Sequence, residues 1–165
     1  MMWDGIERFS ASWFENLLLQ EWIPAMPDVK AHLQRGCDVA DVGCGRGRAL
    51  VKLAQAFPRS RYVGYDNFGS NIARATANAR EADVSDRVRF EERDVSKGLP
   101  AEFDLITTLD VVHDAVDPFQ LLQSICRALR PAAYMFVSTS IVPTRSRKIC
   151  TLWARCFMAS ACSIA

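Results

Sequence analysis

The segment Val39-Ala40-Asp41-Val42-Gly43-Cys44-Gly45-Arg46-Gly47 carries the clearest structural signal in this 165-residue sequence. It begins in an apolar run, residues 37–42, which predicts the end of a buried strand. Three glycines follow at alternate positions, and a helical apolar face then begins, formed by Leu50, Leu53, Ala54 and Phe57. A strand, a glycine turn and a helix in this order suit a nucleotide-like ligand, because glycine lets the backbone turn tightly and lets a ligand approach closely.

The spacing of the glycines separates two classes of ligand. The dinucleotide fingerprint G-x-G-x-x-G needs glycine at position 48, where this chain has Arg48, so an NAD-dependent oxidoreductase is disfavoured. The string D-V-G-C-G-R-G, residues 41–47, instead resembles motif I of the class I S-adenosylmethionine (SAM)-dependent methyltransferases. The resemblance implies that Asp41 faces the ammonium group of the cofactor. It also implies that the loop holds the amino-acid end of the cofactor, through Gly43, Cys44, Gly45 and Gly47.

A second feature stands 19 residues after Gly47, where a predicted strand over residues 61–66 ends in Asp66. Rossmann-like folds place a ribose-binding carboxylate at about this separation. A carboxylate suits that role because it accepts hydrogen bonds from two vicinal hydroxyl groups. Asn67 follows directly and is expected to assist. The alternative is that Asp66 only ends a strand in a solvent-exposed turn.

Two further strands are predicted to end in acidic residues. Residues 87–95 form a third strand after an alanine-rich helix, residues 69–83, and the family resemblance places Asp94 and Val95 beside the adenine. The apolar run 103–109 predicts a fourth parallel strand, buried on both faces. The strand-end acids follow the order of the strands, so we expect them at one edge of the sheet.

The fourth strand runs into L-D-V-V-H-D, residues 109–114, which resembles the motif IV region of the same family. The resemblance adds Asp110 to the cofactor-binding residues. His113 is the side chain in this region that can act as a base near neutral pH. The alternative is that His113 caps or packs the next helix. Methyl transfer to an acceptor that is already nucleophilic needs no base, because positioning supplies most of the rate.

The last patterned segment is a helix that opens at Asp117-Pro118 and a fifth strand over residues 132–138. The family has glycines after L-K/R-P, and this chain has Leu-Arg-Pro-Ala-Ala, so we expect strain or adjustment at that turn. The predicted fold is α/β, with a doubly wound, mostly parallel sheet flanked by helices.

The predicted organisation has three parts. Residues 1–36 form a helical segment that packs on the core or lines a substrate pocket as a lid, and residues 37–138 form the SAM-binding core. Residues 139–165 form a basic and apolar tail, in the same domain or unstructured, with no antiparallel hairpin and with helical spacing of Leu152, Trp153, Cys156 and Phe157. A natural short form, a truncation or a shifted reading frame near residue 138 would each explain this tail.

Composition narrows the class of protein further. Half of the residues are hydrophobic and the net charge is +1, as in an ordinary soluble domain. Residues 1–117 hold 14 basic and 19 acidic residues, a net charge of −5, whereas residues 118–165 hold six basic and no acidic residues. The basic cluster at 145–148 is too small to predict nucleic-acid binding. Six cysteines without a C-x-x-C pair and only two histidines predict no metal site.

The chain has no signal-peptide pattern and no apolar run of membrane-spanning length, so a cytoplasmic location is expected. The predicted function is a SAM-dependent methyltransferase that acts on a small-molecule acceptor. The alternative is a SAM-binding module without catalysis, inactive or truncated, that acts through interactions. The sequence specifies neither the acceptor nor the oligomeric state.

Overall fold

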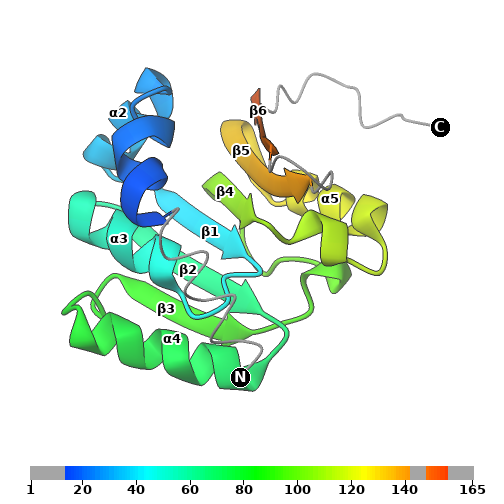
Figure 1. Cartoon of the computed structure of the whole chain (residues 1–165), viewed down its shortest axis with the longest axis horizontal. Coiled ribbons are helices and arrows are strands. Elements are labelled where there is room, and N and C mark those ends of the chain that lie inside the picture. Colours follow the sequence, from blue (N-terminus) through cyan, green and yellow to red (C-terminus); the bar gives the residue numbers. More distant parts are fainter. Residues whose placement is uncertain (1–13, 142–147, 156–165) are drawn as a thin grey trace.

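The fold is a single six-stranded sheet with helices on both faces (Figure 1). The structure is a computed structural model that describes residues 14–141 and 148–155. The strands lie in the order β3-β2-β1-β4-β5-β6. Their bounds are β1 (Asp38–Val42), β2 (Arg61–Asp66), β3 (Val88–Glu92), β4 (Phe103–Leu109), β5 (Leu129–Ile141) and β6 (Lys148–Arg155). Strands β1 to β5 pair in parallel, and β6 pairs antiparallel to β5.

The helical elements divide between the two faces of the sheet. The first face carries the helical segment η1 (Phe14–Trp22) and the helices α2 (Pro27–Arg35), α3 (Arg48–Ala56) and α4 (Gly69–Glu81). The second face carries α5 (Pro118–Arg127) and the one-turn element η2 (Val95–Lys97). A second one-turn element, η3 (Val112–Asp114), follows β4. This alternation of strands and helices confirms the predicted doubly wound α/β class.

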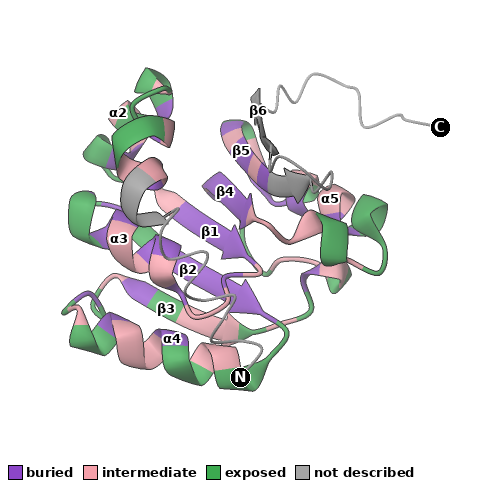
Figure 2. Cartoon of the chain, in the orientation of Figure 1, coloured by how far each residue is buried: buried purple, intermediate pink, exposed green. Residues whose placement is uncertain are grey.

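Burial explains why the central strands read as apolar runs. Figure 2 shows β1, β2 and β4 largely buried, while the outer faces of the helices are exposed. On the first face, Leu33, Leu50 and Leu53 form one core cluster with the strands; on the second, Ile106 and Ile125 belong to another. Strands covered on both faces have no solvated side, so their sequence loses the polar–apolar alternation of an exposed sheet.

The described part of the N-terminal segment packs on the core. Leu18 of η1 is almost fully buried, and the ring of Trp22 lies 5.3 Å from the ring of Phe136 in β5. In α2, His32 makes an edge contact with Tyr134 of β5 at 5.6 Å. Leu18 and Trp22 therefore pack on the core. The rest of the predicted stripe, residues 3–13, lies outside the described residues.

The prediction for the tail was wrong at residues 148–155. They form β6, and its backbone pairs with β5 from Tyr134↔Arg155 to Ile141↔Lys148. Of the four positions with helical spacing, Leu152 and Trp153 belong to β6, and Cys156 and Phe157 lie outside the described residues. Ile149 and Thr151 are β-branched residues that favour a strand. The free edge of β5 also offers backbone partners that side-chain periodicity does not reveal. The sheet thus ends in an antiparallel strand pair, where none was expected.

The predicted strain after Leu-Arg-Pro is present at Ala132. This residue has φ of +64°, in the left-handed region that glycine adopts freely. The pairing of β4 with β5 is irregular at the same place, because Phe103 pairs with Leu129 whereas Leu105 pairs with Tyr134. Alanine here keeps the bulged conformation that the family's glycine would adopt without a Cβ penalty.

Replacing Ala132 by glycine is therefore expected to stabilise the protein. The left-handed alanine costs about 1–2 kcal/mol, and the extra chain entropy of glycine recovers part of that, so we expect a gain of about 0.5–1 kcal/mol. The midpoint of urea unfolding measures the change. The control is Ala133→Gly, at a buried neighbour without positive φ, which should destabilise. A lower midpoint for Ala132→Gly would contradict the strain.

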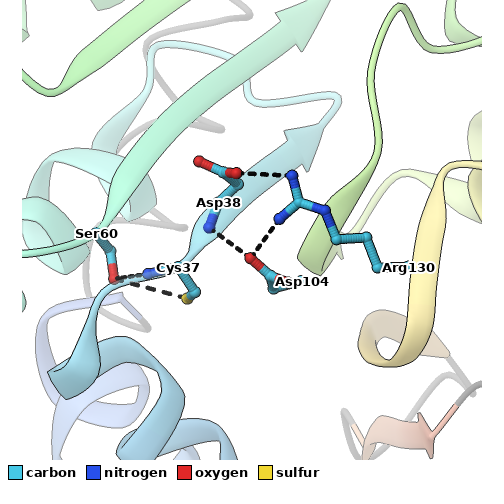
Figure 3. A network of polar contacts seen from close by, with 5 residues as sticks. All are labelled: Cys37, Asp38, Ser60, Asp104 and Arg130. Carbon is cyan, nitrogen blue, oxygen red and sulfur yellow. Dashed lines mark hydrogen bonds and ion pairs between the residues drawn. The ribbon is translucent and has the colours of Figure 1, made fainter.

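A charged cluster ties three strands together at the amino edge of the sheet (Figure 3). The guanidinium of Arg130 donates to Asp38 Oδ2 at 2.8 Å and to Asp104 Oδ2 at 2.7 Å. The backbone N–H of Asp38 also donates to Asp104 Oδ2, at 2.9 Å. These residues open β1 and β4 and lie at the beginning of β5, so the cluster fixes the strands at the edge opposite their carboxyl ends.

Candidate functional site

The carboxyl edge of the sheet gathers most of the predicted site residues in one row. In the strand order β3-β2-β1-β4, the ends of these strands lead to Asp94, Asp66, the glycine loop 43–47 and Asp110. Residues from four separated parts of the sequence thus become neighbours. Open α/β sheets bind ligands at this edge, near the place where the chain reverses its direction of winding, here between β1 and β4.

The Asp66 carboxylate lies at the centre of this row and contacts the glycine loop directly. Its Oδ2 accepts the backbone N–H of Gly45 at 2.9 Å. Its Oδ1 accepts the backbone N–H of Phe68 at 2.9 Å and the Nδ2–H of Asn71 at 3.1 Å. Asp66 is only 8% exposed. The structure therefore brings Asp66 and Gly45 together, as the two motifs predicted, whereas its neighbour Asn67 is exposed.

The glycine loop is anchored to β2 through its backbone. The N–H groups of Gly43 and Cys44 both donate to the carbonyl of Tyr65, at 2.8 and 2.9 Å. The Cys44 thiol is buried, and burial raises its pKa, so it remains a neutral packing group. The loop's contribution to ligand binding therefore comes from its backbone.

The three glycines of the loop have different surroundings. A Cβ on Gly43 would lie 2.7 Å from Cγ1 of Val111, and a Cβ on Gly47 would lie 2.6 Å from Cε1 of Phe90. A Cβ on Gly45 would have no atom within 4 Å. Gly43 and Gly47 thus leave room for protein side chains, whereas Gly45 faces open space next to Asp66. Gly45 is the position where a ligand can approach the loop backbone.

Asp41 lies deeper than the sequence suggested. It is 2% exposed, and its Oδ1 accepts the hydroxyl proton of Thr107, its cross-strand partner on β4, at 2.6 Å. Burial raises the pKa of Asp41 to about 7; the Thr107 hydrogen bond opposes this rise and the negative charge of Asp66 adds to it. Asp41 is thus a buried carboxyl beneath the loop.

Asp94 and Val95 lie at the end of the row, beyond β3. Asp94 is exposed and caps η2: its Oδ1 accepts the N–H of Ser96 at 3.1 Å and the Ser96 hydroxyl at 2.6 Å. These bonds and the neighbouring Lys97, 3.2 Å away, hold the pKa of Asp94 below its ordinary value. Val95 is buried in the second core cluster. The role of both residues in binding adenine stays a prediction.

Asp110 and His113 follow β4. Asp110 has φ of +62°, and its N–H donates to the carbonyl of Ser138 at 2.6 Å. His113, on η3, is exposed between two carboxylates: Nδ1 lies 3.7 Å from Asp110 Oδ1, and Nε2 lies 3.4 Å from Asp114 Oδ1. A left-handed non-glycine residue at such an edge is frequent in functional sites. This arrangement leaves both the base and the capping alternative for His113 open.

Several residues of the edge were missed by the sequence analysis. Phe68 is 55% exposed two positions after Asp66. Asn71 and Asn78 donate side-chain hydrogen bonds to Asp66 and to the carbonyl of Arg46. The position of Phe68 beside a predicted ribose carboxylate was a usable signal. The contacts of Asn78 cross 32 residues of sequence, and spacing alone gives no sign of them.

A doubly wound sheet with a glycine loop and a carboxylate at adjoining strand ends defines an α/β domain of the kind that binds nucleotide cofactors. The chain belongs to the family described as "Methyltransferase domain", whose family model matches residues 33–162.

Individual relatives agree with this family. The chain is 30% identical over 138 residues to the ubiquinone biosynthesis O-methyltransferase of Pseudomonas syringae pv. tomato, covering 83% of this chain and 56% of the relative. It is 33% identical over 102 residues to the 27-O-demethylrifamycin SV methyltransferase of Amycolatopsis mediterranei, covering 60% of this chain and 37% of that protein. The chain thus spans about half the length, or less, of these relatives.

Solved structures show the same fold. The StiE O-methyltransferase domain has a TM-score of 0.67 and 23% identity, over 86% of this chain and 49% of that one. The O-methyltransferase of a trans-AT PKS multienzyme from Brevibacillus brevis, in complex with S-adenosylhomocysteine, has a TM-score of 0.59 and 21% identity. That match covers 66% of this chain and 37% of the other.

The described residues hold neither a metal-binding group of side chains nor a membrane-spanning helix. No three His, Cys, Asp or Glu side chains among them are grouped so that they could hold a metal ion. In the same residues, no helix is long and apolar enough to cross a membrane.

Proposed function

We propose that this chain binds SAM and that it serves a methyltransferase acting on a small-molecule acceptor. The observation that carries the proposal is the hydrogen bond from Gly45 N–H to Asp66 Oδ2, which joins the glycine loop of β1 to the carboxylate that ends β2. Family membership supports the methyl-transfer chemistry. One relative named above is an O-methyltransferase of ubiquinone biosynthesis, and the other is the methyltransferase of 27-O-demethylrifamycin SV. Both names support a small-molecule acceptor.

The residues present fit the cofactor. Asp66 Oδ1 already accepts two protein donors, whereas Oδ2 accepts one. Oδ2 is therefore the oxygen with more capacity for ribose hydroxyl groups. Gly45 leaves open space beside it for the chain that continues from the ribose. Phe68 offers an exposed ring next to Asp66, and an aromatic ring suits contact with a purine face.

Bound SAM would supply an electrophilic methyl group on a sulfonium. The chain's own residues bind and orient: the loop 43–47 and Asp66 fix the cofactor, and η3 places His113 at the adjoining strand end. Asp110 and Asp114 flank the two nitrogens of His113 at that strand end. His113 is thus placed to take a proton from an acceptor hydroxyl, while alignment supplies most of the rate.

Cofactor binding is expected to depend on pH through Asp41. The folded-state pKa is about 7 and the ordinary value is 3.8, so between these values the folded protein holds a proton that the unfolded chain releases. The free energy of unfolding therefore falls as pH rises across this window. A cationic cofactor favours the ionised carboxylate, so SAM affinity should rise about tenfold from pH 5.5 to 7.5. Calorimetry at several pH values measures the change.

The control for this pH dependence is Asp41→Asn, which keeps the shape and removes the titrating group. We expect weaker SAM binding by the variant and a nearly flat profile over the same range. An equally steep profile in Asp41→Asn would assign the pH dependence to another group.

The proposal as a whole is tested by calorimetry with S-adenosylhomocysteine, SAM and NAD. Binding of the first two and none of NAD is the expected result. Tight NAD binding without SAM binding would overturn the proposal. Methyl transfer from labelled SAM to a panel of small hydroxylated acceptors then tests catalysis. Cofactor binding without transfer across the panel would favour the alternative of a SAM-binding module.

The cytoplasmic location and the absence of nucleic-acid binding stay predictions from the sequence.

A further inference from the structure

One face of α4 lies against both halves of the candidate site. Asn71, Ala75 and Asn78 occupy positions i, i+4 and i+7 of this 13-residue helix and therefore share a face. Figure 1 shows α4 alongside β2 and β3, the strands that lead to Asp66 and Asp94. A helix packed on the sheet in this way is a rigid support for groups at the strand ends.

Asn71 fixes the carboxylate half of the site. Its Nδ2 donates to Asp66 Oδ1 at 3.1 Å, and Oδ1 also accepts the N–H of Phe68 at 2.9 Å. These two donors hold Oδ1 against α4. Because the carboxylate is planar, fixing Oδ1 also fixes the direction of Oδ2, which accepts the N–H of Gly45. Asn71 thereby orients the oxygen that has remaining capacity for a ligand.

Asn78 and Ala75 fix the glycine-loop half. Asn78 Nδ2 donates to the carbonyl of Arg46 at 2.9 Å, within the loop. Ala75 is fully buried, and a Cβ on Gly47 would lie 3.0 Å from the Cβ of Ala75. The loop is thus hydrogen-bonded to α4 on one side of Gly47 and packed against it at Gly47. A larger residue than alanine at position 75 would displace the loop.

We propose that Asn71 and Asn78 are positioning residues that preset the two halves of the cofactor site from one helix. Asn71 orients Asp66 for the ribose, and Asn78 holds the loop for the amino-acid end. The inference rests on the proposed function, because it assigns the two asparagines to parts of the same cofactor. The charge on Asp66 makes its bond to Asn71 stronger than a neutral hydrogen bond, whereas Asn78 makes a neutral one.

The test compares two probes: S-adenosylhomocysteine, and 5′-methylthioadenosine, which keeps the adenosine and thioether but lacks the amino-acid end. We expect Asn71→Ala to weaken both probes about tenfold, because losing a bond to a charged group costs that much or more. We expect Asn78→Ala to weaken S-adenosylhomocysteine several-fold and to leave 5′-methylthioadenosine unchanged. Titration calorimetry gives the affinities, and thermal unfolding of each variant accompanies them.

The matched control is Thr76→Ala on the same helix. The Thr76 hydroxyl donates to the carbonyl of Ile72 at 2.9 Å, so its hydrogen bond stays within α4. This variant should bind both probes as the unaltered chain does. If Asn71→Ala does not fold, Asn71→Asp keeps the shape of the side chain while replacing the donor by a carboxylate. It should weaken both probes more than tenfold, because it sets a second negative charge against Asp66.

The probes also separate the possible failures. Unchanged affinity of Asn71→Ala for both probes overturns the inference, and so does equal loss of both probes in Asn78→Ala, which indicates a general structural role. In both cases the unaltered chain still binds S-adenosylhomocysteine, so the proposed function survives. If the unaltered chain binds neither probe, the proposed function fails and the inference fails with it.

Discussion

Replacing Asp66 by alanine is expected to weaken cofactor binding about 10- to 100-fold while leaving a folded chain. Three protein donors occupy Asp66, so the variant loses one further acceptor site for a ribose hydroxyl group. A hydrogen bond to a charged group is worth about 1.5–3 kcal/mol, which gives this loss in affinity for S-adenosylhomocysteine. Titration calorimetry measures this loss, with circular dichroism to confirm the fold.

The same substitution also affects the ligand-free protein, and the design must separate the two effects. Alanine leaves three donors of the site without their acceptor, on Gly45, Phe68 and Asn71. Some loss of thermal stability is therefore expected. Asp86→Ala is the matched control, because Asp86 precedes β3 and its side chain is 72% exposed. That variant should keep full affinity. Affinity within a few-fold of the unaltered chain in Asp66→Ala would exclude the ribose contact.

The sequence predicted the parts of the fold in which local pattern and final environment agree. Strand β4 was predicted with its observed bounds, because a strand covered on both faces is a continuous apolar run between turn residues. Asp66 and the glycine loop were predicted as neighbours because parallel strands bring their carboxyl ends to one edge. The strain at Ala132 followed from missing glycines alone, since backbone conformation there depends on one residue.

Other features depend on contacts that no local pattern encodes. Strand β6 forms because the edge of β5 offers unpaired backbone groups, and a helical spacing of four side chains carries no information about that edge. The burial of Asp41 against Thr107 depends on the register of β1 with β4. Asn71 and Asn78 look like ordinary polar positions of a surface helix. The contact of Asn78 with Arg46 spans 32 residues of sequence and exists only because α4 lies on the glycine loop.

The surroundings of Gly47 and Gly45 differ, so the same substitution should affect a different property at each position. Alanine should mainly reduce stability at Gly47 and mainly reduce cofactor affinity at Gly45. Gly47→Ala should mainly destabilise the fold, because Gly47 has φ of +74° and its Cβ would lie 2.6 Å from Phe90 and 3.0 Å from Ala75. Left-handed strain of about 1–2 kcal/mol and overpacking of about 1–3 kcal/mol together predict a loss of about 3 kcal/mol. Urea unfolding without ligand measures the loss.

Gly45→Ala should mainly reduce cofactor affinity. Gly45 has φ of +52° and no atom near its absent Cβ, so only left-handed strain of about 1–2 kcal/mol is expected in the ligand-free protein. The new methyl group would enter the space beside Asp66 that the cofactor needs, and affinity for S-adenosylhomocysteine should fall more than tenfold. Measuring urea midpoints and affinities for both variants gives a crossed pattern. If Gly45→Ala binds the cofactor normally, the open space beside Gly45 is not the binding site, and the cofactor must lie elsewhere along the carboxyl edge.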